Sequence, residues 1–161
     1  MSNLLTSRRF LPLFITQFLG AFNDNLFKNA LMILITYRLA ASDSGAAVQW
    51  VNLAFALFTL PYLLFSYLAG QIADKIDRAR VARWVKLSEI LLALTGSAAL
   101  VLNNVPLLLL TLFGFGTHSA FFGPVKYALL PQHLREDELL TGNGYIEAAT
   151  FLAILTGTIL G

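Results

Sequence analysis

The chain has 161 residues, of which 57% are hydrophobic and 12% are charged, against roughly 45–50% and about 25% in a typical soluble domain. With a mean hydropathy of +0.70, this composition excludes an ordinary water-soluble globule and a disordered chain. The formal net charge of +2 is too small for a surface that binds nucleic-acid phosphates, so we expect no nucleic-acid partner. The chain contains no cysteine, which removes disulfides, thiolate metal sites and cysteine nucleophiles.

Membrane spans are the first elements that the sequence predicts. Crossing a bilayer core takes about 20 predominantly apolar helical residues, and the chain offers four complete segments of this kind and a fifth that stops at its last residue. They lie at about 10–39, 48–73, 85–102, 105–127 and 145–161. Pro61 is expected to kink the second span. We therefore expect an all-α, polytopic membrane helix bundle, truncated at its C-terminus within a longer protein.

Basic residues gather at one side of these spans. The opposite side has only Arg38, and Lys28 lies within the first span. Because cytoplasmic connections carry an excess of Lys and Arg, this distribution predicts a multi-pass protein with a cytoplasmic N-terminus. The nine residues on the basic side are Arg8, Arg9, Lys75, Arg78, Arg80, Arg83, Lys86, Lys126 and Arg135.

The first span has a polar segment at its middle, from Gln17 to Asn29. A charge at that depth costs about 2.5–3.5 kcal/mol on insertion scales, so these side chains should face protein or water. Asp24 and Lys28 are one helical turn apart and can pair. The segment has two interpretations, an internal ion pair that holds helices together and a substrate or proton pathway, and we favour the pathway. Its face comprises Gln17, Gly20, Asp24 and Lys28, with Asn25 and Asn29 on the adjoining strip.

The fourth span carries small residues that permit close helix approach. The pair Gly123-Pro124 is expected to disturb its cytoplasmic end, and Lys126 follows as a contact for a lipid phosphate or as a side chain that snorkels to the interface. His118, near the depth of Asp24, is either a hydrogen-bonded core residue or a head-group or proton contact. The small residues are Gly114, Gly116, Ala120 and Gly123.

The fifth span contains one acid and two regularly spaced glycines. We expect Glu147 to pair with Lys126 or with the basic cluster of residues 78–83. Gly157 and Gly161 have the spacing of a small-xxx-small helix contact.

The connection after the second span carries a recognisable pattern. We expect a loop here, in which Asp74 accepts hydrogen bonds from a neighbouring helix N-terminus while Gly70 allows close packing. The pattern resembles the cytoplasmic signature between the second and third helices of the major facilitator superfamily, with Asp77 in place of its glycine and Ala79 in place of a basic residue. It reads Gly70-x-x-x-Asp74-Lys75-x-x-Arg78-x-Arg80.

Three further segments, at 17–28, 121–131 and 142–148, resemble the lysophospholipid transporter branch of that superfamily. The resemblance implies the N-terminal five helices of a twelve-helix carrier in a bacterial inner membrane, which moves lysophospholipids inward for reacylation. It also implies membrane lipids as partners and a possible fused or associated acyltransferase. The expected substrate-binding residues are Asp24, Lys28, Asn25, Gln17, Lys126 and His118, and the expected gating residues are Gly70, Asp74, Lys75, Arg78 and Arg80.

Two other functions remain open at this point. One is a proton-coupled carrier of small solutes or drugs with Asp24 as its protonatable site, and the other is a membrane anchor for a fused acyltransferase. The sequence has no Walker glycine loop, no Gly-x-Ser-x-Gly elbow and no metal-ligand set. We therefore expect no enzymatic activity, cofactor or metal in this segment.

Overall fold

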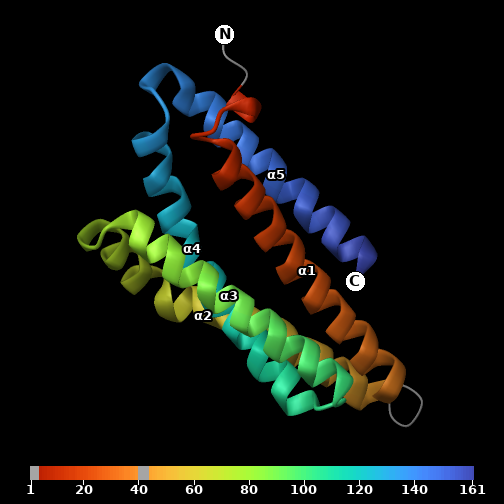
Figure 1. Cartoon of the computed structure of the whole chain (residues 1–161). Helices are drawn as coiled ribbons and strands as arrows, with labels where there is room; N and C mark the ends of the chain where they lie inside the picture. The colour runs from red at the N-terminus through yellow and green to blue at the C-terminus, as the bar shows by residue number, and fades with distance from the viewer. Residues whose placement is uncertain (1–3, 40–43) are drawn as a thin grey trace.

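The computed structural model of the chain describes residues 4–39 and 44–161. Its described part consists of helices, without a strand, which confirms the expected all-α bundle. Five are long, and two short 3-10 turns precede the first and the last of them (Figure 1). In order they are η1 (Leu4–Thr6), α1 (Leu11–Leu39), α2 (Ser44–Lys75), α3 (Arg78–Val101), α4 (Val105–His133), η2 (Glu136–Glu138) and α5 (Leu139–Leu160).

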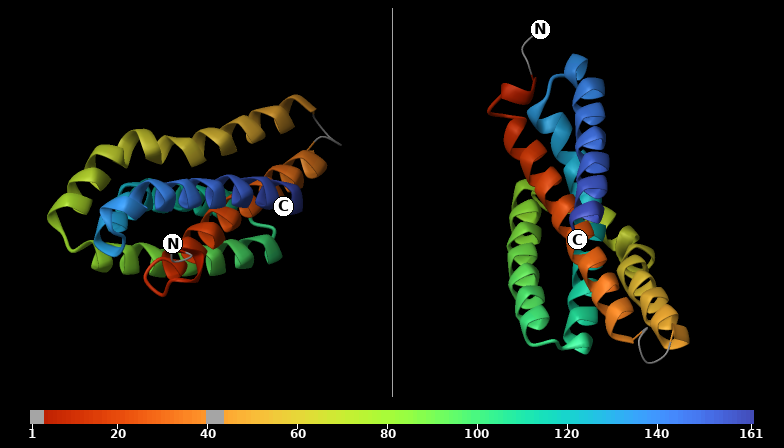
Figure 2. Two further views of the ribbon diagram at one scale, coloured as in Figure 1. Left: turned by 90° about the horizontal axis from the view of Figure 1, so that it is seen from above. Right: turned by 90° about the vertical axis from the view of Figure 1, so that its right-hand side faces the viewer.

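Short connections with a capping side chain lead into α3 and α4. The Asp77 side chain accepts a hydrogen bond from the backbone N–H of Arg80 at 2.8 Å and caps α3, and the Asn104 side chain accepts one from Leu107 at 3.1 Å and caps α4. Such caps satisfy backbone donors that have no partner inside the helix. Asn103 has a φ of 52° and turns the chain between α3 and α4. Figure 2 shows this turn at the opposite end of the bundle from the N-terminus.

The helices run further than the expected membrane spans. Residues 74 and 75, expected in the connection after the second span, belong to α2, and only Ile76 and Asp77 separate α2 from α3. That expectation was wrong because hydropathy detects the apolar part of a helix and not its charged last turn. The positions at which these helices enter and leave a membrane stay a prediction.

Prolines do not end either of the helices that contain them. α2 is helical through Pro61, and the left view of Figure 2 shows that it is bent. A proline lacks the N–H for the bond to the preceding turn, which is a frequent cause of such bends. α4 is helical through Pro124 and Pro131 and reaches His133, so the break expected after Gly123 is absent.

α4 is the central helix of the described bundle. It lies between α2 and α3, while α1 packs along α5 and also touches α2 and α4 (Figures 1 and 2). The largest core cluster joins α1 to α4, where the rings of Phe27 and Phe115 lie 5.1 Å apart between centroids. Leu31, Leu108 and Leu112 are fully buried beside them. The bundle is therefore held mainly around α4.

Glycines set the closest helix contacts. A Cβ atom on Gly157 would lie 2.6 Å from the carbonyl oxygen of Phe22, and one on Gly161 would collide with the backbone of Leu26. This confirms the expected small-xxx-small contact and assigns it to α5 against α1. Gly116 makes the corresponding approach of α4 to the backbone of α2. Around Gly70, by contrast, no described atom lies within 4 Å of an added Cβ, so the close packing expected there is absent from the described chain.

Four of the long helices, α2 to α5, are long and apolar enough to cross a membrane. α1 is as long, but its polar segment lowers its hydropathy. Large apolar side chains point outward from the bundle, among them Leu63, Leu91 and Phe151. An exposed apolar surface of this kind suits lipid as the surrounding solvent.

We predict that Gly157→Ala lowers the stability of the full-length protein, because its methyl group cannot fit against the backbone of α1. Overpacking of this kind costs roughly 1–3 kcal/mol. The matched control is Gly144→Ala in the same helix, where an added Cβ meets no described atom within 4 Å. It should be neutral or stabilising by up to about 1 kcal/mol, since alanine favours a helix. Thermal unfolding in detergent measures both, and equal midpoints would contradict the contact.

Candidate functional site

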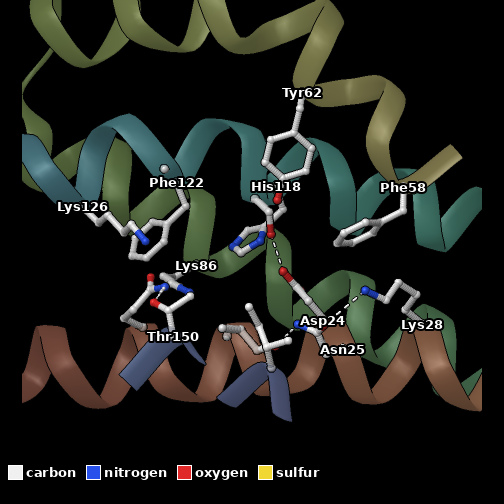
Figure 3. Close-up of a pocket in the computed structure, with 16 residues that line it drawn as sticks. Asp24, Asn25, Lys28, Phe58, Tyr62, Lys86, His118, Phe122, Lys126 and Thr150 are labelled. Atoms are coloured by element: carbon white, nitrogen blue, oxygen red, sulfur yellow. Dashed lines mark hydrogen bonds between the residues drawn. The ribbon is translucent and has the colours of Figure 1, made fainter. Parts of the chain in front are cut away.

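A polar cavity of about 360 Å³ lies where all five long helices meet. Figure 3 shows the polar face of α1 on one side of it and α2 and α4 on the other. The polar face of α1 that the sequence singled out opens into this space, as does Asn25 of the adjoining strip, whereas Asn29 donates to the backbone oxygen of Thr158 in α5. The residues of α1 that line it are Gln17, Gly20, Ala21, Asp24, Asn25 and Lys28.

Asp24 and Lys28 have separate partners. The hydroxyl of Ser119 in α4 donates a hydrogen bond to Oδ2 of Asp24 (Figure 3), whereas Lys28 Nζ donates to Oδ1 of Asn25 at 2.9 Å and lies 5.0 Å from the ring centroid of Phe58. Asp24 and Lys28, whose spacing would allow them to pair, form no ion pair in the structure, because Ser119 and Asn25 take up the two charged groups. Asp24 Oδ1 is buried and has no hydrogen-bond partner among the described residues. The carboxylate thus keeps one accepting atom free.

Gln17 connects α1 to α5 at the cavity wall. Its Nε2 donates to the hydroxyl oxygen of Thr150 at 2.8 Å, and the Gln17 side chain is buried. Asn25 also donates to the backbone oxygen of Ala21, so that its amide is held on both sides. These two amides are fixed polar groups in the wall of the cavity.

Lys126 enters the cavity from α4. It is buried, and its Nζ lies 3.9 Å from a carboxylate oxygen of Glu147 and 4.8 Å from the ring centroid of Tyr127. Tyr127 donates its hydroxyl hydrogen to the same carboxylate. Of the two partners expected for Glu147, the structure has Lys126. The distance of 3.9 Å leaves the ammonium loosely held and able to bind a second anion.

A charged network between α3 and α4 was not predicted from the sequence. Lys86 Nζ and Glu89 Oε2 form an ion pair at 2.7 Å, and His118 Nε2 lies 3.2 Å from the same oxygen. Nδ1 of His118 has no hydrogen-bond partner in the described part of the chain. Lys86 had been assigned only to the basic side, and Glu89 to an apolar span. The available signal was their i,i+3 spacing, which places both on one face of α3.

The Lys86 ammonium reaches the cavity because of two neighbours. It lies 4.0 Å from the ring centroid of Phe122, and a Cβ on Gly20 would lie 2.6 Å from it. The glycine therefore leaves room for the end of the lysine. Phe58 and Tyr62 of α2 complete the wall, and no pattern in their apolar span distinguishes them from lipid-facing aromatics.

This cavity combines charged groups with apolar walls, as a binding site for an amphiphilic molecule would. Three ammonium groups, those of Lys28, Lys86 and Lys126, share it with one carboxylate, that of Asp24, and with apolar walls. Within the described chain, no group of three or more His, Asp or Glu side chains could hold a metal ion. The arrangement can bind an anion and a cation of one molecule at the same time.

The expected gating residues lie outside this cavity, at the ends of α2 and α3. Arg78 donates from Nη1 to the backbone oxygen of Ala128 at 3.2 Å and from Nε to that of Ala73 at 3.4 Å, and so ties α3 to α2 and α4. The N-terminus of α3 is capped by Asp77, whereas we had expected Asp74 to cap it. Three members of the set are exposed, namely Asp74, Lys75 and Arg80.

Comparison with known proteins identifies the family. Residues 13–161 match the Major Facilitator Superfamily, and the chain belongs to that superfamily. It is 32% identical to the Lysophospholipid transporter LplT of Salmonella arizonae over 157 residues, or 98% of this chain. It is 34% identical to the proteins of the same name from Salmonella paratyphi B and Salmonella newport over 158 residues, or 96% of this chain. The match covers 36% of each relative's length. No solved structure matches.

We predict that Asp24 is coupled energetically to Ser119 more strongly than to Lys28. Residues in one hydrogen bond show interaction energies of about 0.5–3 kcal/mol in a double-mutant cycle. Asp24→Asn combined with Ser119→Ala should give a value in this range, and Asp24→Asn combined with Lys28→Gln a smaller one. The quantity to measure is the stability of the full-length protein in detergent. A larger interaction energy between Asp24 and Lys28 would contradict this prediction and would indicate an ion pair between these two residues.

Proposed function

We propose that this chain is the N-terminal part of a secondary transporter that moves lysophospholipids across a bacterial inner membrane to the cytoplasmic leaflet. One observation carries the proposal: the polar cavity sets a half-satisfied carboxylate and three ammonium groups against aromatic and aliphatic walls. The relatives named Lysophospholipid transporter LplT support the same substrate class. The twelve-helix architecture of the whole carrier and the reacylation of its product by a fused or associated acyltransferase belong to the proposal.

The zwitterionic head group of lysophosphatidylethanolamine fits this cavity chemically. Its ammonium would bind the free oxygen of Asp24, and its phosphate would bind Lys126, whose only carboxylate neighbour among the described residues is 3.9 Å away. Charge-assisted hydrogen bonds of this kind are about twice as strong as neutral ones. Gln17, Asn25, Lys28 and His118 would complete the polar surround, and the acyl chain would lie against the apolar wall.

Orientation follows from the charges. The basic connections lie at the end of the bundle that carries the N-terminus, and the positive-inside rule places that end in the cytoplasm. A proton-coupled carrier of small solutes is the second candidate, since Asp24 has one buried oxygen with no described hydrogen-bond partner. A simple membrane anchor gains nothing from charges at this depth, each of which is costly to insert.

The gating residues would contact the part of the carrier that lies outside this chain. Asp74, Lys75 and Arg80 are exposed, and an added Cβ on Gly70 meets no described atom within 4 Å. This surface, at the ends of α2 and α3, is open for contact with the part of the protein that lies outside this chain. Arg78 would hold the two helix ends together during such a contact.

We predict that Asp24→Asn and Lys126→Gln each abolish most of the inward movement of labelled lysophosphatidylethanolamine in vesicles that contain the full-length protein. Asp24→Asn combined with Lys28→Gln should remain as inactive as the worse single variant, because the two residues have different partners. Asp137→Asn, a change of the same kind at an exposed carboxylate, should leave the rate unchanged.

Protein amounts in the vesicles must be matched. Recovery of transport by the double variant would reduce both residues to a structural role. A proton-coupled solute carrier predicts instead that Asp24→Asn abolishes uphill transport and leaves downhill exchange measurable. Vesicles of the unaltered protein that never move the lipid would contradict the proposed function altogether.

A separate prediction concerns the two aspartates at the α2–α3 connection. Asp74→Asn should lower transport more than Asp77→Asn, because asparagine caps a helix as well as aspartate does. Asp77→Ala, which removes the cap of α3, should lower stability by about 0.5–2 kcal/mol. Thermal unfolding and lipid transport on the same preparations measure both. Unchanged transport by Asp74→Asn would argue against a gating role.

A further inference from the structure

A second, basic groove of about 430 Å³ lies at the end of the bundle that carries the N-terminus. It is formed by the segment that leads into α1, by the first turns of α1 and of α3, and by the second half of α4. Four basic side chains and one histidine line it. These residues are Arg8, Arg9, Arg83, Lys86 and His133.

Only part of this charge is neutralised. Arg9 forms an ion pair with Glu138 at 2.7 Å, and Lys86 forms one with Glu89 at 2.7 Å. Arg8 and Arg83 form no ion pair with any carboxylate of the described residues, and Arg83 uses only its Nε, which donates to the backbone oxygen of Ala79 at 3.4 Å. Two guanidinium groups thus keep donors free, and a guanidinium binds phosphate in a bidentate manner.

The floor of the groove is apolar. This floor consists of Pro12 and Leu13 of α1, Ala82 of α3 and Leu129 of α4, so a ligand that fits both the floor and the basic side chains has an anionic group and a hydrocarbon segment. A free anion would leave this floor in contact with water, which is unfavourable for apolar surface.

The groove and the central cavity are neighbours. Lys86 and Phe122 line both of them, and the lysine ammonium lies 4.0 Å from the ring centroid of Phe122. The same ammonium is 3.5 Å from the backbone oxygen of Thr16, another groove residue. One cation is therefore shared between two hollows, each of which has charged and apolar walls.

We propose that the groove is a binding site for the phosphate of a single-chain glycerophospholipid. Arg8 and Arg83 bind the phosphate, and the acyl chain lies on the floor formed by Pro12, Leu13 and Leu129. Lys86 faces the phosphate from the cavity side and is the contact common to the two sites. Binding in the groove stands on its own, and its role as a station between the cavity and the cytoplasmic leaflet rests on the proposed function.

The test uses local protection of a cysteine introduced into the full-length, otherwise cysteine-free protein in detergent. Ala79 lines the groove and is exposed, so Ala79→Cys should react readily with a maleimide. Octanoyl lysophosphatidylglycerol should slow this reaction in a saturable manner. Octanoyl glycerol, which has the chain without the phosphate, and inorganic phosphate, which lacks the chain, should protect at least tenfold more weakly.

Substitutions of single arginines test whether the lipid protects the cysteine by binding in the groove. Arg83→Gln should raise the concentration for half-protection about tenfold, since one charge-assisted contact is lost. Arg135→Gln removes the same charge from the same end of the bundle, outside the groove, and should leave that concentration unchanged. The lipid should still protect Ala79→Cys from the maleimide when Asp24→Asn is also present, because Asp24 lines only the cavity. Loss of transport can therefore be told apart from loss of lipid binding in the groove.

Three results would overturn the proposal. If Arg83→Gln and Arg135→Gln raised the concentration for half-protection equally, the lipid would be attracted by the general surface charge and not by the groove. Equal protection by inorganic phosphate alone would show a free-anion site. An Ala79→Cys protein that folds and resists maleimide without lipid would show that another part of the protein fills the groove.

Discussion

The fold depends on how the polar face of α1 is satisfied. A charged or amide side chain at the middle of a membrane helix is expensive unless protein or water surrounds it. α4 supplies the hydroxyl of Ser119 to Asp24, and α5 supplies that of Thr150 to Gln17. Because these partners come from helices far along the chain, α1 can be accommodated only when the bundle has assembled. The contacts that satisfy the polar side chains of α1 within a membrane also form the walls of the cavity.

Close helix approach brings these partners within reach. Gly157 and Gly161 let α5 lie directly on the backbone of α1, and Gly116 does the same for α4 against α2. Without water to drive apolar surfaces together, small residues and van der Waals contact hold membrane helices in place. The cavity is thus bounded by helices that are tightly packed outside it, and Gly20 and Gly123 keep its interior open.

Much of this could be predicted from sequence, for identifiable physical reasons. The helices and the polar segment of α1 follow from hydropathy, and the Gly157–Gly161 contact follows from spacing. The i,i+3 spacing of Glu89 and Lys86 was available from the sequence, but the approach of Glu89 to His118 joins two helices and could not be predicted. The hydrogen bond between Asp24 and Ser119 could not be predicted either, because the two residues are 95 positions apart in the sequence. The apolar span expected from residue 85 lies within α3, which begins at Arg78, and hydropathy could not reveal this start because it ignores the cap that Asp77 provides.

The charges around the cavity balance. The three lysines that reach it face three acids, Asp24, Glu89 and Glu147, so their formal charges sum to zero. Moving one elementary charge through a membrane potential involves about 2.3 kcal/mol per 100 mV. If the cavity carries a zwitterionic lipid, as proposed, the loaded site would stay electrically neutral, and the movement of that lipid would not depend on the membrane potential. A lipid with a net negative charge would make the loaded site negative, and the membrane voltage would then bias the direction of its movement.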